Sequence, residues 1–137
     1  MAARTAGKAT PVRSAMTATS PLQATVADGL GAVRTAHHRC LDARVRTDFA
    51  DSLDLDDALR AEHPEENRWD YLLGHEPSGE VIALEPHSAR SDQVSNVISK
   101  RRAAMEQLAG HLRPGARVSR WLWVASGRIH FADTEKA

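Results

Sequence analysis

The feature that most constrains the fold is a change in the spacing of apolar residues near the middle of the chain. Two short runs rich in aromatic, aliphatic and β-branched residues, 68–73 and 80–84, are separated by the sequence GHEPSG. Proline suits the second position of a turn and glycine suits a position with positive φ, so Pro77 and Gly79 indicate a tight connection. Two such runs on either side of a turn are typical of a β-hairpin.

A long amphipathic helix is expected after this hairpin. Ser91 is placed to cap its start, and Pro114 is placed to end it near Arg113. Apolar residues recur through this stretch at helical spacing and would form the inner stripe of the helix. They are Val94, Val97, Ile98, Met105, Leu108 and Leu112.

A second hairpin is expected near the end, from the run 118–125, a Ser-Gly turn and the run 128–131. Trp121 and Trp123 are two residues apart and therefore share one face of a strand, while the residues between and after them make the other face apolar. A strand that is apolar on both faces is central or covered on both sides. Core packing or an interface is a better interpretation of the two tryptophans than a platform for stacking bases.

The first half of the chain is less regular. Residues 1–22 are mostly small and polar, lack periodicity and contain Pro11 and Pro21, which predicts a disordered tail before a single domain over 23–137. Apolar residues at helical spacing predict a helix over 25–42. The run 44–49 alternates like a short strand, although it could extend that helix. Aspartate caps then favour a short acidic helix over 54–62. The expected class is α+β, an α/β sandwich with helix, hairpin, long helix and hairpin around one mixed sheet.

Composition limits the range of functions. A chain of 137 residues has room for one core, and its formal net charge of zero argues against a protein that coats nucleic acid generally. Cys40 is the only cysteine, which excludes an intramolecular disulfide and a four-cysteine zinc site and favours a reducing, cytoplasmic setting. No apolar run approaches the roughly 20 residues of a membrane span, so no membrane partner is expected.

Chemistry is concentrated at the expected central hairpin. Asp70 lies on its first strand, and Glu85 and His87 lie two residues apart at the end of its second strand, where they would project to the same side. Converging carboxylates bind hard cations such as Mg²⁺ or Mn²⁺. A bound cation would lower the pKa of a coordinated water and stabilise charge on a phosphoryl oxygen. His87 could orient that water, accept its proton or act as a third ligand.

A purely structural interpretation of the same residues stays open. Asp70 could pair with Arg68 or bond a backbone group, and Glu85 could pair with Arg90. The pair His37 and Cys40 is half of a metal site at most, because no second pair has matching spacing, so packing is the better interpretation. The acidic run 51–57 lacks the glycine and the final glutamate of a calcium loop.

The order of expected elements, together with Asp70, Glu85 and His87, resembles the restriction-endonuclease-like superfamily, often called PD-(D/E)xK. The resemblance covers roughly residues 25–132. It implies an αβββαβ core, Asp70 and Glu85 as metal ligands, and His87 at the position where the family usually has lysine. Proteins of this kind mostly cleave phosphodiesters of DNA or RNA. The sequence departs from the pattern at Trp69, which stands where the family has proline, and at His87.

In that family the following helix can supply the basic residue, a role that Lys100 could fill. Lys100 is also the first residue of a basic cluster that could contact phosphates. The candidate residues for contacting nucleic acid, with DNA favoured over RNA, are Arg90, Gln93, Asn96, Lys100, Arg101 and Arg102, and Arg113, Arg117 and Arg120 could extend that surface. An ordinary solvated helix face would account for the same charges.

Two functions follow as hypotheses. The first is a small Mg²⁺- or Mn²⁺-dependent nuclease with Asp70, Glu85, His87 and Lys100 as its catalytic residues. The second is an inactive scaffold of the same fold that acts through a partner protein or as a homodimer. The scarcity of large core side chains and the doubly apolar tryptophan strand favour this alternative. Nucleic-acid binding without cleavage is a third, weaker hypothesis, and it would show a steep dependence of affinity on salt.

Overall fold

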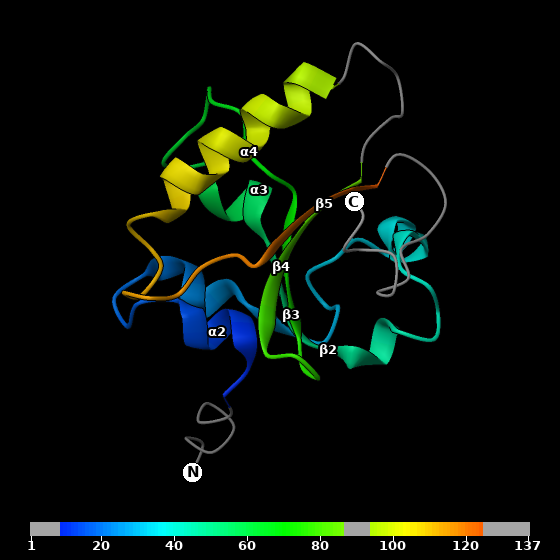
Figure 1. Ribbon diagram of the computed structural model, residues 1–137. Coiled ribbons are helices and arrows are strands. Elements are labelled where there is room, and N and C mark those ends of the chain that lie inside the picture. The colour runs from blue at the N-terminus through cyan, green and yellow to red at the C-terminus, as the bar shows by residue number, and fades with distance from the viewer. Residues whose placement is uncertain (1–8, 87–93, 125–137) are drawn as a thin grey trace.

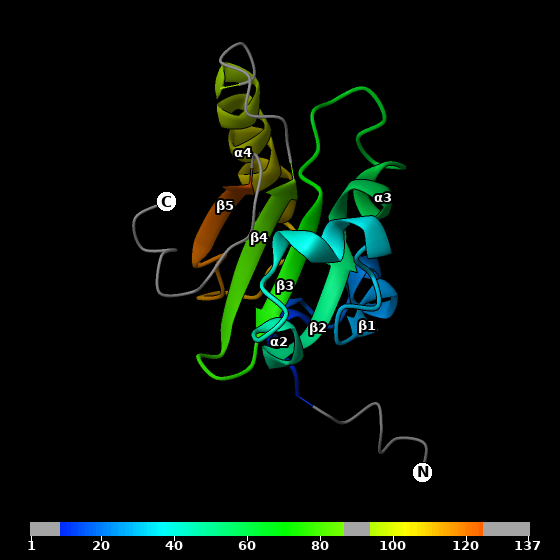
Figure 2. The same ribbon diagram turned by 90° about the vertical axis from the view of Figure 1, so that its right-hand side faces the viewer.

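The computed structural model describes residues 9–86 and 94–124, apart from the side chains of residues 94–96. Within them the chain forms an α+β fold around a five-stranded mixed sheet (Figures 1 and 2). The strands lie in chain order, and only the last pair, β4 with β5, is parallel. They are β1 Ala27–Asp28, β2 Phe49–Asp54, β3 Tyr71–His75, β4 Glu80–Pro86 and β5 Arg120–Val124.

Helices cover both faces of the sheet. Figure 1 shows α2 (Pro11–Ala15), α3 (Leu55–Leu59) and α4 (Val94–Leu108) on one side. The other side carries the short 3-10 helices η2 (Thr35–Cys40) and η3 (Arg46–Asp48), and Figure 2 shows η2 in front of the strands. A further 3-10 helix, η1 (Pro21–Thr25), follows α2. Because α4 connects two parallel neighbours, it is the crossover between β4 and β5.

Side chains alternate along the strands and fill two cores. Val81 and Ala83 of β4 pack with Leu72 on the face that α2 and α4 cover. Ile82 and Leu84, which alternate with them in sequence, pack on the face that carries η2. This alternation decides where Glu85 lies, because it continues the row of Val81 and Ala83 toward α4.

The expected central hairpin is confirmed. Tyr71 to His75 pair residue by residue with Leu84 to Glu80 in antiparallel register. Gly79 has φ +74° in the turn, where residues with a Cβ are disfavoured, and its N–H donates to the His75 carbonyl at 2.8 Å. Local turn chemistry was sufficient to predict this element.

The expected tail over residues 1–22 is wrong from Pro11 onward. Residues Pro11–Ala15 form α2, and Val12 and Met16 are fully buried against the sheet. The backbone N–H groups of Val12 and Arg13 donate to the buried Asp51 carboxylate at 3.1 and 2.9 Å. A partner 38 or 39 residues away therefore fixes a segment whose composition looked disordered.

The expected helix over 25–42 is also wrong. The chain instead turns at Gly29, whose φ of +55° is left-handed, and pairs as β1 with β2 before forming η2. The short strand expected over 44–49 does not form, because residues 46–48 are in η3. The first central strand, β2, begins at Phe49. The short acidic helix is present as α3, with the Asp54 side chain accepting from the Asp57 N–H at 3.0 Å.

The expected long helix is present as α4, but its inner stripe differs. Val97 and Leu108 are buried as expected, whereas Ile98 and Met105 are 56% and 52% exposed. Ala104 is fully buried in their place. The strand expected over 118–125 is present as β5, and the strand expected over 128–131 lies outside the described residues. Across the part of the chain that the structure describes, no helix has the length and apolar character needed to cross a membrane.

Candidate functional site at the end of the central hairpin

Glu85 is a carboxylate set into an apolar row. It continues the line of Val81 and Ala83 on β4 and is 1% exposed. Its Oε1 accepts the backbone N–H of Asp70 at 3.0 Å, and its Oε2 accepts from the ammonium of Lys100. A buried charge needs such partners, because desolvation alone would be prohibitive.

Asp70 and Lys100 complete the group. Asp70 immediately precedes β3, and the pairing of Tyr71 with Leu84 places it beside Glu85 on the neighbouring strand. Lys100 Nζ lies 4.0 Å from Asp70 Oδ1 while it also bonds Glu85. The segment before β3, strand β4 and helix α4 thus bring two carboxylates and one ammonium together. The sequence predicted that Asp70 and Glu85 would converge, and Lys100 was a candidate for the basic residue.

The surroundings of this group raise the pKa of both carboxyls. Burial, together with the negative charge of Asp70, raises the pKa of Glu85 to about 7, while Lys100 acts in the opposite direction. Burial likewise raises the pKa of Asp70, again opposed by Lys100. Titratable groups with such displaced pKa values in one cluster are a common mark of functional sites.

A small polar pocket of about 110 Å³ lies beside Asp70. It is also lined by Arg34, His37 and Tyr71 from the η2 side of the sheet. His37 Nδ1 is 2.6 Å from the Tyr71 hydroxyl, which also accepts the Arg34 N–H at 3.3 Å. Sequence reasoning did not place Arg34 and His37 here, because they were expected in a regular helix that does not form.

The other predicted site residues lie outside the described part of the chain, lack a described side chain or lie away from Glu85. His87, Arg90 and Gln93 lie outside the described residues, and Asn96 lies in α4 without a described side chain. Arg101 does not join the site, since its guanidinium lies over the Trp121 ring at 5.7 Å.

Of the remaining members of the basic set, one faces solvent and two have partners elsewhere in the fold. Arg102 is exposed on α4. Arg113 donates to the Ser14 carbonyl at 2.9 Å, and Arg120 pairs with Glu80 at 3.0 Å. Arg68, the expected partner of Asp70, instead pairs with Asp56 at 3.0 Å.

The donor set that the structure describes consists of two carboxylates. Within the described residues, no group of three or more His, Cys, Asp or Glu side chains could hold a metal ion. Mg²⁺ usually keeps several waters and takes one or two carboxylates from the protein. Asp70 and Glu85 therefore fit a partly hydrated Mg²⁺ or Mn²⁺, provided that the ion competes with Lys100 for Glu85.

A second hydrogen-bonded cluster was not anticipated. Ser20 Oγ is 2.7 Å from His111 Nδ1, and His111 Nε2 is 3.0 Å from Glu62 Oε1. This is the residue set of a serine hydrolase, but Ser20 and His111 are buried. The Ser20 oxygen also accepts the Leu22 N–H at the start of η1. The cluster ties the N-terminal segment to the end of α4 and offers no accessible nucleophile.

We compared the chain with family models, with curated proteins and with solved structures, and none of the three comparisons found a match. The function is therefore inferred from the residues of the site and their chemistry.

Proposed function

We propose that this chain is a small metal-dependent nuclease domain of the restriction-endonuclease-like type that hydrolyses nucleic-acid phosphodiesters. The observation that supports this most strongly is the meeting of Asp70, Glu85 and Lys100 at one end of the central hairpin. They come from the position before β3, from β4 and from α4, and their types match the acid, acid and basic positions of the motif.

The topology also supports the proposal. An αβββαβ core requires a helix, three strands, a second helix and a final strand. The described chain has α2, the antiparallel strands β2, β3 and β4, then α4, and then β5 parallel to β4. The two-residue strand β1 and the helix α3 are additions to that order.

Each residue has a role in the proposed reaction. Asp70 and Glu85 would hold Mg²⁺ or Mn²⁺, which supplies an acidified water and charge stabilisation when bound. Lys100 orients Glu85 and places a fixed positive charge beside the position where a phosphoryl oxygen would gain negative charge. The role predicted for His87, to orient the water or accept its proton, stays part of the proposal.

Protonation of Glu85 would compete with the cation. With a pKa of about 7, a substantial fraction of Glu85 carries a proton at neutral pH, whereas a metal needs the ionised form. Cation binding should therefore strengthen as the pH rises through 7.

The test is cleavage by two isosteric variants, Asp70→Asn and Glu85→Gln, with Asp57→Asn as the matched control. Asp57 is an exposed acid on α3, and its carboxylate pairs with Arg60 at 3.2 Å. Plasmid, single-stranded DNA and RNA would be incubated with Mg²⁺ or Mn²⁺ at pH 8. Both site variants should lose cleavage while folded, and the control should keep it. Cleavage retained by both site variants would refute the proposal.

A specific observation favours one alternative, the same scaffold without turnover. Both oxygens of Glu85 already have partners within the fold, Asp70 N–H and Lys100 Nζ. If this arrangement is purely structural, Mg²⁺ and Mn²⁺ will leave the melting temperature unchanged. A ligand that binds only the folded state raises that temperature by mass action, so the metal titration separates the two functions.

A further inference from the structure

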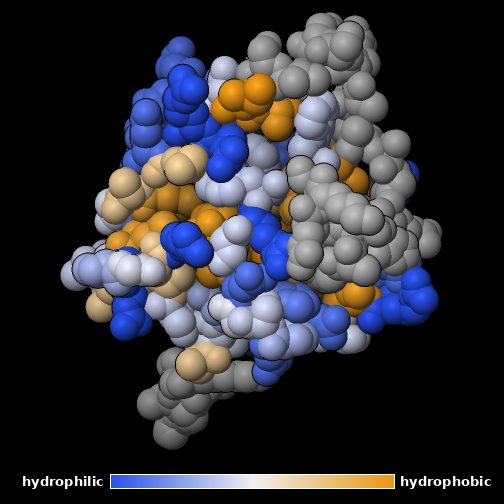
Figure 3. Space-filling view, in the orientation of Figure 1, coloured by the Kyte–Doolittle hydropathy of each residue, from blue (hydrophilic) through white to orange (hydrophobic). Residues whose placement is uncertain are grey.

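A groove of about 400 Å³ lies between α4 and the segment that leads into β5. Its apolar lining includes Met105, Leu112, Val118 and Trp121. Figure 3 shows a hydrophobic patch on the left of this view, over α4 and the following segment, with hydrophilic residues around it. The groove is separate from the Asp70 site. Lys100 bonds Glu85 in that site, whereas the next residue, Arg101, lines the groove and lies over the Trp121 ring.

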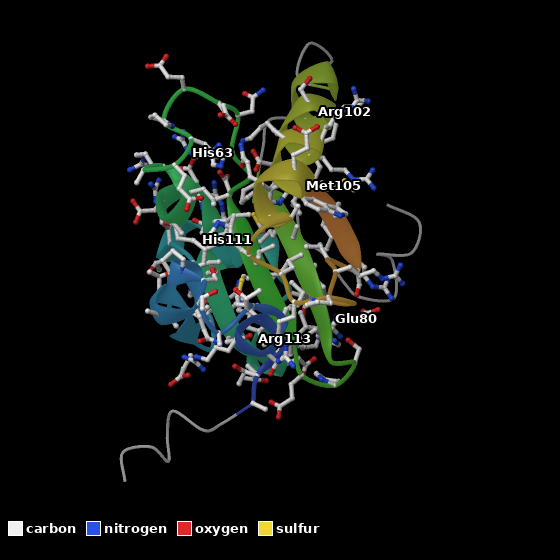
Figure 4. All side chains as sticks on the ribbon, turned by 90° about the vertical axis from the view of Figure 1, so that its left-hand side faces the viewer. His63, Glu80, Arg102, Met105, His111 and Arg113 are labelled. Carbon is white, nitrogen blue, oxygen red and sulfur yellow. The ribbon has the colours of Figure 1, made fainter. Side chains whose placement is uncertain are left out.

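Met105 is placed for contact with something other than the core. It is 52% exposed although the helix buries Ala104 and Leu108 beside it. Figure 4 shows Met105 near β5 and Arg102 farther along the same helix. An unbranched, polarisable methionine adapts to varied apolar partners, and such residues are enriched at binding surfaces.

The described charged residues of the groove are all basic. Among the described residues that line it, the charged ones are Arg101 and Arg117, and no carboxylate is present. Arg101 and Arg117 are both exposed. An occupant should therefore combine apolar side chains with negative charge, because complementary charges fix register and exclude wrong partners.

We propose that this groove binds an acidic amphipathic peptide segment of a partner protein. Its apolar side chains would pack on Met105, Val118 and Trp121, and its carboxylates would pair with Arg101 and Arg117. Arginine forms planar, bidentate contacts with carboxylates, which suits it to such an interface.

Two other occupants fit less well. Stacking of a nucleic-acid base needs an open aromatic face, but Arg101 lies over the Trp121 ring and Trp69 meets that ring edge-on at 5.1 Å. A second copy of this chain offers exposed acid on α3, but Leu55 and Leu59 of that helix are fully buried. Through α3, the copy would thus present carboxylates without apolar side chains.

The test uses a random 16-residue peptide library displayed on phage and selected on the full-length protein. The selected peptides should carry apolar residues at i, i+3 and i+4 or i+7, flanked by Asp or Glu. By fluorescence polarisation, Met105→Glu and the double variant Arg101→Glu, Arg117→Glu should bind them at least about tenfold more weakly. Arg102→Glu, an exposed neighbour outside the groove, should bind like the wild type.

Three results would overturn the proposal. The first is that no peptide is enriched. The second is that enriched peptides bind all variants with equal affinity. The third is that a 20-nucleotide single strand displaces the peptides and that its own binding depends on the same residues. Circular dichroism and light scattering on each variant establish that it is folded and monodisperse. The outcome does not depend on Asp70 or Glu85, so the nuclease proposal can fail while this one stands.

Discussion

Replacing Glu85 by glutamine should stabilise the protein above neutral pH. Glutamine has nearly the shape of the protonated acid, so it can keep the contact with the Asp70 N–H without carrying a buried charge. The ionised carboxylate, by contrast, is held at 1% exposure beside a second carboxylate.

The size of the effect follows from the displaced pKa. In the folded state Glu85 titrates at about 7 instead of its ordinary 4.5. Because the folded pKa is raised, the associated stability is fully present below pH 4.5 and is lost as the pH rises through 7. A difference of about 2.5 between the two pKa values corresponds to about 3 kcal/mol at pH 8. Coupling to Asp70 and Lys100 makes about 1–3 kcal/mol the expected range.

The assay is urea unfolding of the wild type and Glu85→Gln at intervals from pH 4 to pH 8.5, without divalent cations. The free energies of unfolding should agree near pH 4 and separate steadily up to pH 7. The exposed acid Glu106, replaced by glutamine, gives the control, which should show no such separation. A constant difference between Glu85→Gln and the wild type across this range would refute the burial argument.

Three further changes should lower stability. Gly74→Ala places a Cβ 2.0 Å from Asp51 Oδ1 and should lower the free energy of unfolding in urea by about 1–3 kcal/mol. The control Gly110→Ala should be tolerated, because a Cβ there would have no atom within 4 Å. Lys100→Met removes the cation from the buried Glu85 carboxylate and the partly buried Asp70 carboxylate. It should cost on the order of 3 kcal/mol at pH 8 but less at pH 5, so equal losses at both would contradict this role. Ser20→Ala removes the bond to His111 and the side-chain cap of η1. The loss of stability should be about 1–2 kcal/mol and should appear as a lower melting temperature.

Local signals predicted the parts of the fold that depend on neighbours in sequence. Pro77 and Gly79 indicate the central turn, and an aspartate cap indicates α3. Both could be predicted because these effects act within a few residues. The N-terminal segment depended on distant contacts. Nothing local shows that Asp51 will accept two backbone N–H groups from α2, so a short helix with small residues looked like a tail.

The same distinction applies to the candidate site. Asp70 and Glu85 were predicted to meet because they flank one hairpin, whose register the turn determines. Lys100 was expected from the resemblance and lies within bonding distance of Glu85. The pocket residues Arg34 and His37 could not be predicted, because η2 reaches Asp70 through an irregular path on the opposite face of the sheet.

The position of Glu85 separates a functional from a merely structural interpretation. Apolar residues at both 85 and 100 would extend the row of Val81 and Ala83, and well-packed apolar replacements of whole buried ion pairs are often neutral or stabilising. The fold therefore gains no evident stability from a carboxylate whose pKa burial raises to about 7. Lys100 moderates that cost without removing it. A buried acid kept at a net cost in stability is consistent with the proposed role of Glu85 as a ligand of a divalent cation, which would need its charge.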